Sequence, residues 1–384
     1  MKITGTCCLR AWLLAALVSF GGFSCASLPD GLFGPVSEKA PELRVQVQWR
    51  IPISADVLWE LDRRELGQPI ISPGGDLLVG SGQGWVYRIL AHSGEIVWSK
   101  EISSGVDSPA TLANNIAYLG TQNAEMVALD WRNGEEIWRF QARGSLEGRP
   151  SYYEGMLFFV DSNEVLYALN VADGSLLWDY QRSAPEFFTI KGSGIPLIVG
   201  DSVYVGFADG VLVELNRATG EEQWAVYLGD ESGEFGDIDL PILHDQQRLI
   251  VTSHAGGVHG IERATGAVLW RLPFDNVVGV IKEGGFLFGA TATGRVFAAR
   301  AADGEIFWES RLDENSVPMG ISFAGPYLAV PLARGPLVWM DARSGREVLR
   351  WAPSSGFQNA PVFDERRGYI LSNQGYLYGF GLAF

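Results

Sequence analysis

The sequence contains almost no cysteine and little histidine. Its three cysteines, Cys7, Cys8 and Cys25, all lie within the first 25 of 384 residues, and only four histidines occur in the chain. Beyond residue 25 there is therefore no disulfide, no thiolate nucleophile, no cysteine-bound zinc and no CxxCH haem attachment, because each of these needs cysteine. The domain must be stabilised by its own core, and a hydrophobic content of 47% is typical of a well-packed globular protein.

Positive charge is also scarce. Lysine and arginine number 29 against 45 aspartates and glutamates, which gives a net charge of −16. Proteins that bind nucleic acid draw most of their affinity from Lys and Arg side chains that neutralise phosphates. The charge balance therefore argues against a nucleic-acid partner and favours a partner with a basic surface.

Patterns that support catalysis or metal binding are missing as well. His254 and His259 are five residues apart, and alternation along a strand would place them on opposite faces. The motif Gly82-Gln83-Gly84 lies between two predicted strands and no helix follows it, which excludes a dinucleotide fingerprint. No nucleophile stands at an informative spacing from a base. We therefore expect no enzyme activity, no metal site and no cofactor.

The N-terminus is typical of an exported protein. Lys2 and Arg10 precede an apolar run from Ala11 to Phe20, which is too short to span a bilayer of about 30 Å and fits a signal peptide. The residues before Cys25, Gly22-Phe23-Ser24, resemble a lipobox, where bacterial lipoproteins are cleaved and acylated, although Leu or Val is usual at the position of Gly22. Ordinary cleavage around Cys25 remains an alternative.

Three segments follow from this reading. Residues 1–24 are the predicted lipoprotein signal peptide, Cys25 is the predicted lipid attachment site, and residues 25–42 form a flexible tether rich in Pro, Gly, Ser and Ala. Residues 43–384 form the folded domain. Ala26 stands where an Asp would suggest retention in the inner membrane, so we expect a lipid anchor in the outer membrane.

A repeat of about forty residues covers the rest of the chain. Six segments such as "MVALDWRNGEEIW" and "LVELNRATGEEQW" combine a short alternating strand, a turn closed by Gly and a second strand ending in Trp, which indicates a β-hairpin. Two further apolar runs precede each hairpin. Four short strands per period of about forty residues are typical of a β-propeller blade. The closing residues are Trp98, Trp138, Trp178, Trp224, Trp270 and Trp308, with Leu349 in a seventh copy.

The ends of the chain complete the count of blades. Three strands after Leu349 have no closing partner, while "RVQVQW" supplies a lone strand that ends in Trp49. Joining the first and last blades removes open sheet edges, which otherwise template aggregation. We therefore predict an all-β fold, an eight-bladed β-propeller of four-stranded blades in which the N-terminal strand closes the last blade.

The pattern Asp/Asn-x-x-x-Gly followed by a strand ending in Trp resembles the PQQ-type, or quinoprotein-like, propeller repeat. Asp130 to Trp138 and Asn216 to Trp224 carry it best. We expect the tryptophans, Trp49 included, to dock one blade on the next, because Trp buries roughly 150–250 Å². The enzymes of this superfamily imply a PQQ-dependent dehydrogenase, but they carry adjacent cysteines and longer insertions that this chain lacks.

Two adjacent repeats are longer than the others. The spacings from Trp178 to Trp224 and from Trp224 to Trp270 are both 46 residues, and the surplus lies in "DYQRSAPEFFTIKGSGIP" and "YLGDESGEFGDIDLP". Both segments connect the outermost strand of one blade to the innermost strand of the next, so they should be neighbours on one face. Apolar residues rimmed by charge are typical of the centre of a protein interface.

These features together resemble the BamB family of outer membrane assembly lipoproteins. In that family one loop carries an apolar-x-apolar-basic motif and the next carries Asp-x-Asp, and both contact the periplasmic POTRA domains of BamA. Phe188, Ile190 and Lys191 match the first motif, and Asp237 and Asp239 match the second. Lys191 replaces the usual Arg and lacks its planar bidentate fork, so the interface chemistry could differ.

The resemblance implies a noncatalytic scaffold on the periplasmic face of the outer membrane. Its expected partners are BamA, other components of the assembly machinery, and nascent outer membrane proteins, which could pair with exposed blade edges. Three alternatives remain open at this point: ordinary solvated loops without a partner, a dehydrogenase-like enzyme, and a cell-surface propeller that binds another protein or a polysaccharide.

Overall fold

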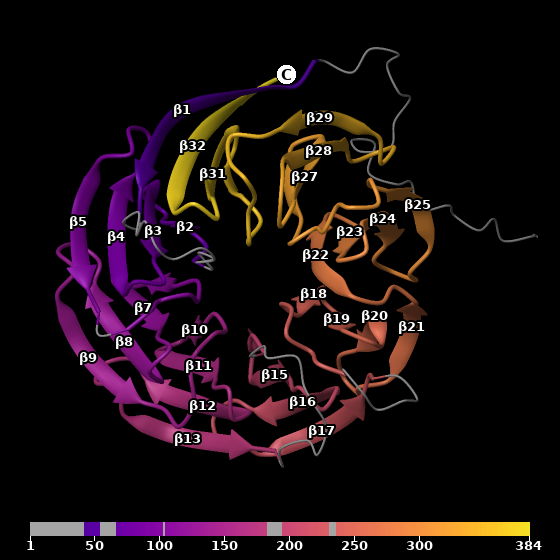
Figure 1. The fold of residues 1–384 in the computed structure, drawn as a ribbon. Helices are drawn as coiled ribbons and strands as arrows, with labels where there is room; N and C mark the ends of the chain where they lie inside the picture. Colours follow the sequence, from indigo (N-terminus) through magenta and orange to yellow (C-terminus); the bar gives the residue numbers. More distant parts are fainter. Residues whose placement is uncertain (1–41, 54–66, 103, 183–193, 230–235) are drawn as a thin grey trace, which may run out of the picture. The chain divides into compact units, whose positions relative to one another are not determined.

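The computed structural model describes residues 42–53, 67–102, 104–182, 194–229 and 236–384. Every helix or strand assigned in these ranges is a β-strand. The strands form eight four-stranded antiparallel sheets, arranged as blades around a central axis (Figure 1). The predicted all-β, eight-bladed propeller is therefore confirmed. The predicted signal peptide, Cys25 and the tether before Glu42 lie outside the described residues.

Each blade is a meander whose first strand is nearest the axis. Blade I contains β2 (Ile70–Ile71), β3 (Asp76–Gly80), β4 (Trp85–Leu90) and β5 (Ile96–Glu101); blade II contains β6 (Thr111–Ala113), β7 (Ile116–Gly120), β8 (Glu125–Asp130) and β9 (Glu136–Gln141); blade III contains β10 (Ser151–Tyr153), β11 (Met156–Val160), β12 (Val165–Asn170) and β13 (Leu176–Gln181); blade IV contains β14 (Leu197–Val199), β15 (Ser202–Gly206), β16 (Val211–Asn216) and β17 (Glu222–Tyr227).

The second half of the ring repeats this order. Blade V contains β18 (Leu243–His244), β19 (Arg248–Ser253), β20 (Gly257–Glu262) and β21 (Val268–Leu272); blade VI contains β22 (Val277–Glu283), β23 (Phe286–Thr291), β24 (Arg295–Arg300) and β25 (Ile306–Arg311); blade VII contains β26 (Ser322–Ala324), β27 (Tyr327–Pro331), β28 (Leu337–Asp341) and β29 (Glu347–Trp351); blade VIII contains β30 (Val362–Asp364), β31 (Arg367–Leu371), β32 (Tyr376–Ala383) and β1 (Arg44–Pro52). None of the described residues forms a helix long and apolar enough to cross a membrane.

The N-terminal strand closes the ring as predicted. β1 pairs antiparallel with β32, with Arg44 opposite Ala383 and Pro52 opposite Tyr376. Blade VIII therefore takes its three inner strands from the C-terminus and its outer strand from the N-terminus. This pairing joins both ends of the folded domain in one four-stranded sheet.

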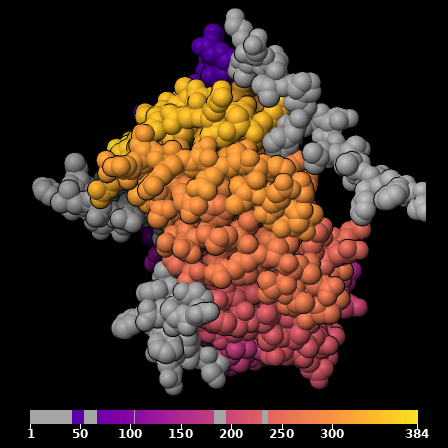
Figure 2. All heavy atoms as spheres, turned by 90° about the vertical axis from the view of Figure 1, so that its right-hand side faces the viewer, coloured from indigo at the N-terminus to yellow at the C-terminus, as the bar shows by residue number. Residues whose placement is uncertain are grey.

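The hydrophobic core lies between blades. Leu78 and Val86 of blade I pack with Leu119 and Val127 of blade II, and all four side chains are buried. Equivalent clusters fill other seams of the ring. Seen from the side, the blades coloured from red to yellow follow one another in close contact (Figure 2). In central strands such as β8 and β11, consecutive residues are buried. Their side chains point alternately to the two faces of the sheet, so each strand packs against both neighbouring blades.

The outer-strand tryptophans bridge each blade to the hairpin of the next. A Cβ atom added to Gly174 would lie 2.7 Å from the Trp138 ring, and Gly174 also has a φ of +72°. Glycine is therefore required at this turn for two reasons: other residues rarely adopt this backbone conformation, and a Cβ atom would overlap the indole. The same contact joins Trp49, Trp98, Trp178, Trp224, Trp270 and Trp308 to the hairpin glycines Gly94, Gly134, Gly220, Gly266, Gly304 and Gly345.

Most of these indoles also donate a hydrogen bond across the seam. The Nε1 atom of Trp138 donates to the carbonyl of Val171 at 2.8 Å, and that of Trp178 donates to Arg217 at 3.0 Å. Trp49, Trp98 and Trp308 make the equivalent bond. The Nε1 atoms of Trp224 and Trp270, by contrast, are buried without a hydrogen-bond partner among the described residues. Both lie at the seams of blade V.

Phenylalanine at Trp178 and at Trp224 is expected to destabilise the protein unequally. Both substitutions remove the same indole atoms from a seam, but only Trp178→Phe breaks a hydrogen bond and leaves the Arg217 carbonyl without its donor. The difference in the free energy of unfolding should be about 1 kcal/mol, the net value of one such bond. Equilibrium urea unfolding measures it, and equal losses in the two variants would contradict the hydrogen-bond assignment.

The structure explains why the seventh copy of the repeat ends in Leu349. Blade VIII has no hairpin between its outer two strands, because β32 and β1 come from opposite ends of the chain. An indole at position 349 would therefore have no turn glycine to pack on. Leu349 instead pairs with Trp339, which is fully buried and packs edge-on against Phe363 and Phe380 of blade VIII.

Candidate functional site

All connections between blades emerge at the same end of the propeller. In a four-stranded meander, the turn between the second and third strands lies at the same end as the connection to the next blade. We name this end the connection face. Backbone hydrogen bonds bind several of these connections to such turns, as from the amide of Ser162 to the carbonyl of Ser145 and from that of His254 to the carbonyl of Asp237. The two long connections, β13–β14 and β17–β18, both belong to this face.

Only two of the five predicted partner-binding residues lie within the described part of the chain. Phe188, Ile190 and Lys191 lie outside the described residues, whereas Asp237 and Asp239 lie within them. The sequence reasoning also missed a third long connection, β1–β2, which spans residues 53–69, with 54–66 outside the described residues. Counting the repeat from Trp98 hid it, although Trp49 precedes Trp98 by 49 residues.

Residues 236–238 are held between the turns of blades IV and V. The Ser253 hydroxyl donates to the carbonyl of Gly236 at 2.9 Å, and the His254 amide donates to that of Asp237 at 2.9 Å. On the other side, the amide of Ile238 donates to the carbonyl of Phe207 at 3.3 Å. The end of the acidic connection is therefore fixed by two blades before β18 begins.

The side chain of Ile238 completes this attachment. It is 2% exposed and packs with Tyr204, Leu212 and Val251. Gly206, at the end of β15, provides the space, since a Cβ atom there would lie 2.1 Å from Ile238 Cγ2. The close approach of Gly206 thus determines where residues 237–239 lie.

Alanine at Gly206 is expected to displace Ile238 and loosen the end of the connection. An added methyl group in a filled core typically costs about 1–3 kcal/mol. The double variant Gly206→Ala/Ile238→Ala should recover part of the loss, because the smaller side chain vacates the space of the new methyl. Urea unfolding of the two single variants and the double variant gives the coupling energy. Strictly additive losses would contradict the proposed contact.

The two aspartates of the predicted motif differ sharply in exposure. Asp237 is 1% exposed, whereas Asp239 is partly exposed. Burial raises the pKa of Asp239, and the nearby His254 lowers it by a smaller amount. The sequence reasoning expected both carboxylates to contact a partner, whereas the structure buries Asp237 and leaves Asp239 partly exposed. A partner could reach Asp239 without any movement of the connection.

A buried acid that the sequence reasoning missed lies beside this motif. Glu164 is 9% exposed and occupies the turn between β11 and β12, where its Oε2 accepts a hydrogen bond from the amide of Ala208 at 2.9 Å. Its φ is +61°, and the equivalent residues of blades I and IV are Gly84 and Gly210, with φ of +84° and +77°. A non-glycine residue in this conformation is uncommon and often marks a functional position.

Burial and three neighbouring acids raise the pKa of Glu164 to about 7. Burial is the largest cause, the hydrogen bond from Ala208 opposes it, and the charges of Asp209, Asp237 and Asp161 raise the pKa further. Asp209 is itself paired with Arg182 at 3.0 Å. The signal in the sequence was a Glu at a turn position where most other repeats carry Gly and blade II carries Ala124, which shows only when the turns are aligned.

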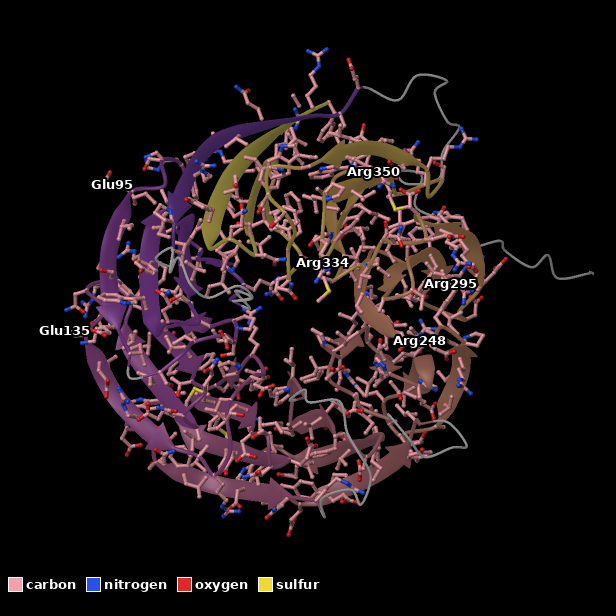
Figure 3. All side chains as sticks on the ribbon, in the orientation of Figure 1. Glu95, Glu135, Arg248, Arg295, Arg334 and Arg350 are labelled. Carbon is pink, nitrogen blue, oxygen red and sulfur yellow. The ribbon has the colours of Figure 1, made fainter. Side chains whose placement is uncertain are left out.

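The described residues offer little for catalysis. His259 is 4% exposed, and burial, with a contribution from Arg271, lowers its pKa to about 4, so it is neutral at physiological pH. No group of three or more His, Cys, Asp or Glu side chains in the described ranges is arranged to hold a metal ion. Toward the centre of the ring the figure shows Arg334, an exposed residue of blade VII (Figure 3).

Comparisons with known sequences agree on one family. The family model described as "Outer membrane protein assembly factor BamB" matches residues 82–310 and 302–381. The BamB of Yersinia pestis is 24% identical over 326 residues, which cover 80% of this chain and 82% of that protein. The crystal structure of BamB from Moraxella catarrhalis has a TM-score of 0.75 at 20% identity and covers 88% of this chain and 100% of that chain.

An enzyme shares the same architecture. Quinohemoprotein alcohol dehydrogenase from Comamonas testosteroni has a TM-score of 0.68 at 13% identity, and the match covers 88% of this chain and 76% of that chain. At this identity the likeness shows the fold alone.

Proposed function

Because the chain belongs to the BamB family of outer membrane protein assembly factors, we propose that it is a noncatalytic scaffold that docks on the periplasmic POTRA domains of BamA. In this role it assists the folding and insertion of outer membrane proteins. The observation that carries the docking proposal is Asp239, which is partly exposed and directly follows residues 236–238, which two blades hold in place. A surface acid in a fixed position suits a basic partner.

The docking surface combines both long connections. Phe188 and Ile190 supply apolar contact, Lys191 supplies a cation, and Asp239 supplies an anion. Asp237 acts differently in this proposal, because a side chain that is 1% exposed cannot contact a partner directly. Its role is to position the connection, since its carbonyl accepts the His254 amide and its neighbour Ile238 fills the seam.

The absence of catalysis is part of the proposal. Two observations support it: the chain has no cysteine after residue 25, and the described residues hold no cluster of metal-ligating side chains. The dehydrogenases of similar fold are related to this chain by architecture alone.

The location follows from the N-terminus and the family. Acylation of Cys25 would anchor the propeller to the outer membrane on its periplasmic face, with residues 26–42 as the tether. Other components of the assembly machinery and nascent outer membrane proteins are further partners in this setting. Mass spectrometry of the mature N-terminus distinguishes an acylated Cys25 from ordinary cleavage.

A cell assay tests the function. Cells that lack their own family member are complemented with the wild type or with Asp239→Arg, and the amount of a folded outer membrane protein is measured. We expect the wild type to restore it and Asp239→Arg to restore clearly less at equal protein level. Failure of the wild type to restore any folded protein would refute the assembly role.

A further inference from the structure

A pocket of about 370 Å³ lies on the inner wall of the ring at blades II to V. Its lining comes from the first strands of blades II to IV, from Arg149 and Pro150 of the β9–β10 connection, and from the last residues of both long connections, Ile195 and Pro196 in one and Pro241 and Ile242 in the other. The volume lies within the range of roughly 300–1,000 Å³ that ligand pockets usually have. The pocket is thus continuous with the segments that form the proposed docking surface.

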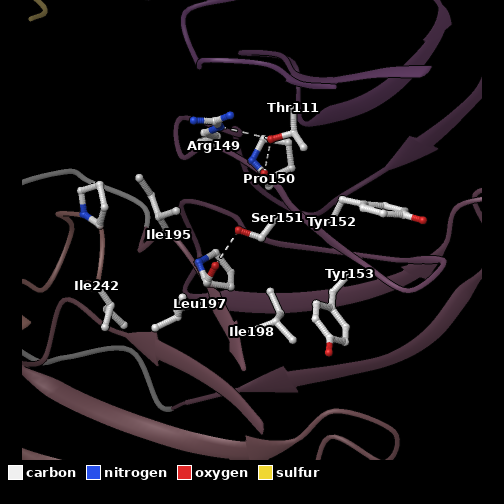
Figure 4. A pocket seen from close by; sticks show the side chains of 12 residues that line it. Thr111, Arg149, Pro150, Ser151, Tyr152, Tyr153, Ile195, Leu197, Ile198 and Ile242 are labelled. Atoms are coloured by element: carbon white, nitrogen blue, oxygen red, sulfur yellow. Dashed lines mark hydrogen bonds between the residues drawn. The ribbon is translucent and has the colours of Figure 1, made fainter. Parts of the chain in front are cut away.

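The walls of the pocket are mainly apolar. Figure 4 shows Ile195, Leu197, Ile198 and Ile242 on one side, with Thr111, Arg149 and Pro150 on the other. The hydroxyl of Ser151 already donates a hydrogen bond within the protein, to the carbonyl of Pro196 at 2.5 Å. The hydroxyl of Thr111 likewise donates to the carbonyl of Pro150. Neither of these hydroxyl hydrogens is therefore available to a ligand.

Arg149 supplies the one cation of the lining. Its Nε donates to Thr111 Oγ1 at 3.3 Å, and within the part of the chain that the structure describes it forms no ion pair with a carboxylate. The residue is exposed as a whole, but burial of the guanidinium lowers its pKa. A guanidinium has five N–H donors in a planar fork that matches a carboxylate, and most of these donors remain available.

We propose that this pocket receives a bulky apolar side chain of a bound partner, with a neighbouring carboxylate of the same segment on Arg149. The inference rests on the proposed docking function, because the pocket borders the two connections that form the docking surface. Charge complementarity selects the partner segment. In a chain of net charge −16, an arginine that has no acidic partner among the described residues and lies beside an apolar pocket fits an acidic-apolar segment and disfavours a basic one.

The test is the dissociation constant for the purified periplasmic domains of BamA. Arg149→Glu is expected to weaken binding at least about tenfold, because it places a carboxylate against a carboxylate. Ile198→Trp, which fills the pocket, should weaken binding similarly. The matched control is Arg346→Glu, the same charge reversal at an exposed arginine in the β28–β29 hairpin, at the end opposite the connection face, and it should change binding less than about twofold.

A spectroscopic measurement locates the contact. In protein labelled at the isoleucine δ-methyl groups, the BamA periplasmic domains should shift the methyl resonances of Ile195, Ile198 and Ile242. N-acetyl-phenylalanine serves as a small probe of the same chemistry, and its amide, which lacks the charge, is the control. The acid should shift these resonances at high concentration and the amide less, and BamA should displace the acid.

The outcomes separate this inference from the proposed function. If the wild type binds BamA and Arg149→Glu binds as well as Arg346→Glu does, the pocket is not part of the interface and the inference is wrong while docking stands. Absence of wild-type binding would refute docking itself. Tight binding of the small acid that BamA does not displace would show a site for small carboxylates and would overturn the assignment to a partner segment.

Discussion

Glutamine in place of Glu164 is expected to raise the free energy of unfolding at pH 8 by about 3 kcal/mol. The pKa of Glu164 rises from an ordinary 4.5 to about 7 in the folded protein, and each unit corresponds to about 1.4 kcal/mol. Ionised Glu164 therefore destabilises the fold, because burial disfavours its charge and the nearby Asp209, Asp237 and Asp161 repel it. Glutamine has no charge and keeps an oxygen that can accept the hydrogen bond from Ala208.

The sign of the pH dependence follows from proton binding. Between about pH 4.5 and pH 7 the folded protein holds a proton on Glu164 that the unfolded chain has released, so the contribution of this group to stability falls as the pH rises. Glu164→Gln lacks this contribution. The stability difference between variant and wild type should grow through this window and level off above about pH 7.

Urea unfolding at several pH values measures this difference. Glu135→Gln is the matched control, because Glu135 is exposed on the outer rim in the hairpin of blade II (Figure 3). Its stability difference from the wild type should not change with pH by more than about 0.5 kcal/mol. A difference for Glu164→Gln that is the same at pH 4 and at pH 8 would contradict the raised pKa.

Arginine at Asp239 is expected to weaken binding to the BamA periplasmic domains at least about 30-fold. Loss of one partner from a desolvated charge pair costs about 2–5 kcal/mol, and a like charge adds repulsion. Stability should change little, because Asp239 is partly exposed and Ile238 still holds the connection. Biolayer interferometry gives both rate constants, and the loss should appear mainly as faster dissociation.

Asp237→Asn should behave differently from Asp239→Arg. Asp237 is buried, so we expect its effect on binding to accompany a loss of stability, whereas that of Asp239→Arg should not. Glu135→Arg repeats the charge reversal at the other end of a blade and should leave affinity within about twofold. Equal affinity for Asp239→Arg and Glu135→Arg would place the interface elsewhere.

The blade architecture could be predicted because its determinants are local. A turn glycine and a tryptophan four positions apart recur in six repeats, and both take part in the same kind of seam contact, as Gly174 and Trp138 do between adjacent blades. The departure at Leu349 was visible but not explicable. Its cause is that blade VIII combines strands from both ends of the chain and so has no hairpin between its outer two strands. Trp339 fills the seam there instead.

The site was harder to predict because its determinants come from several blades. The burial of Asp237 depends on turns of blades IV and V, and the position of Ile238 depends on Gly206. The environment of Glu164 combines an amide from blade IV with acids from three turns and connections. A strand pattern can show that residues alternate, but it cannot show which face neighbouring blades will cover.

Hydrogen–deuterium exchange of the protein alone and bound to the BamA periplasmic domains tests the docking surface most directly. We expect the complex to protect backbone amides of residues 183–196 and 236–242, on the connection face of blades III to V. The hairpins at residues 91–95 and 131–135, at the opposite end, should exchange equally in both states. Protection confined to those hairpins, or an unchanged pattern at 183–196 and 236–242 in a saturated complex, would contradict docking through the connection face.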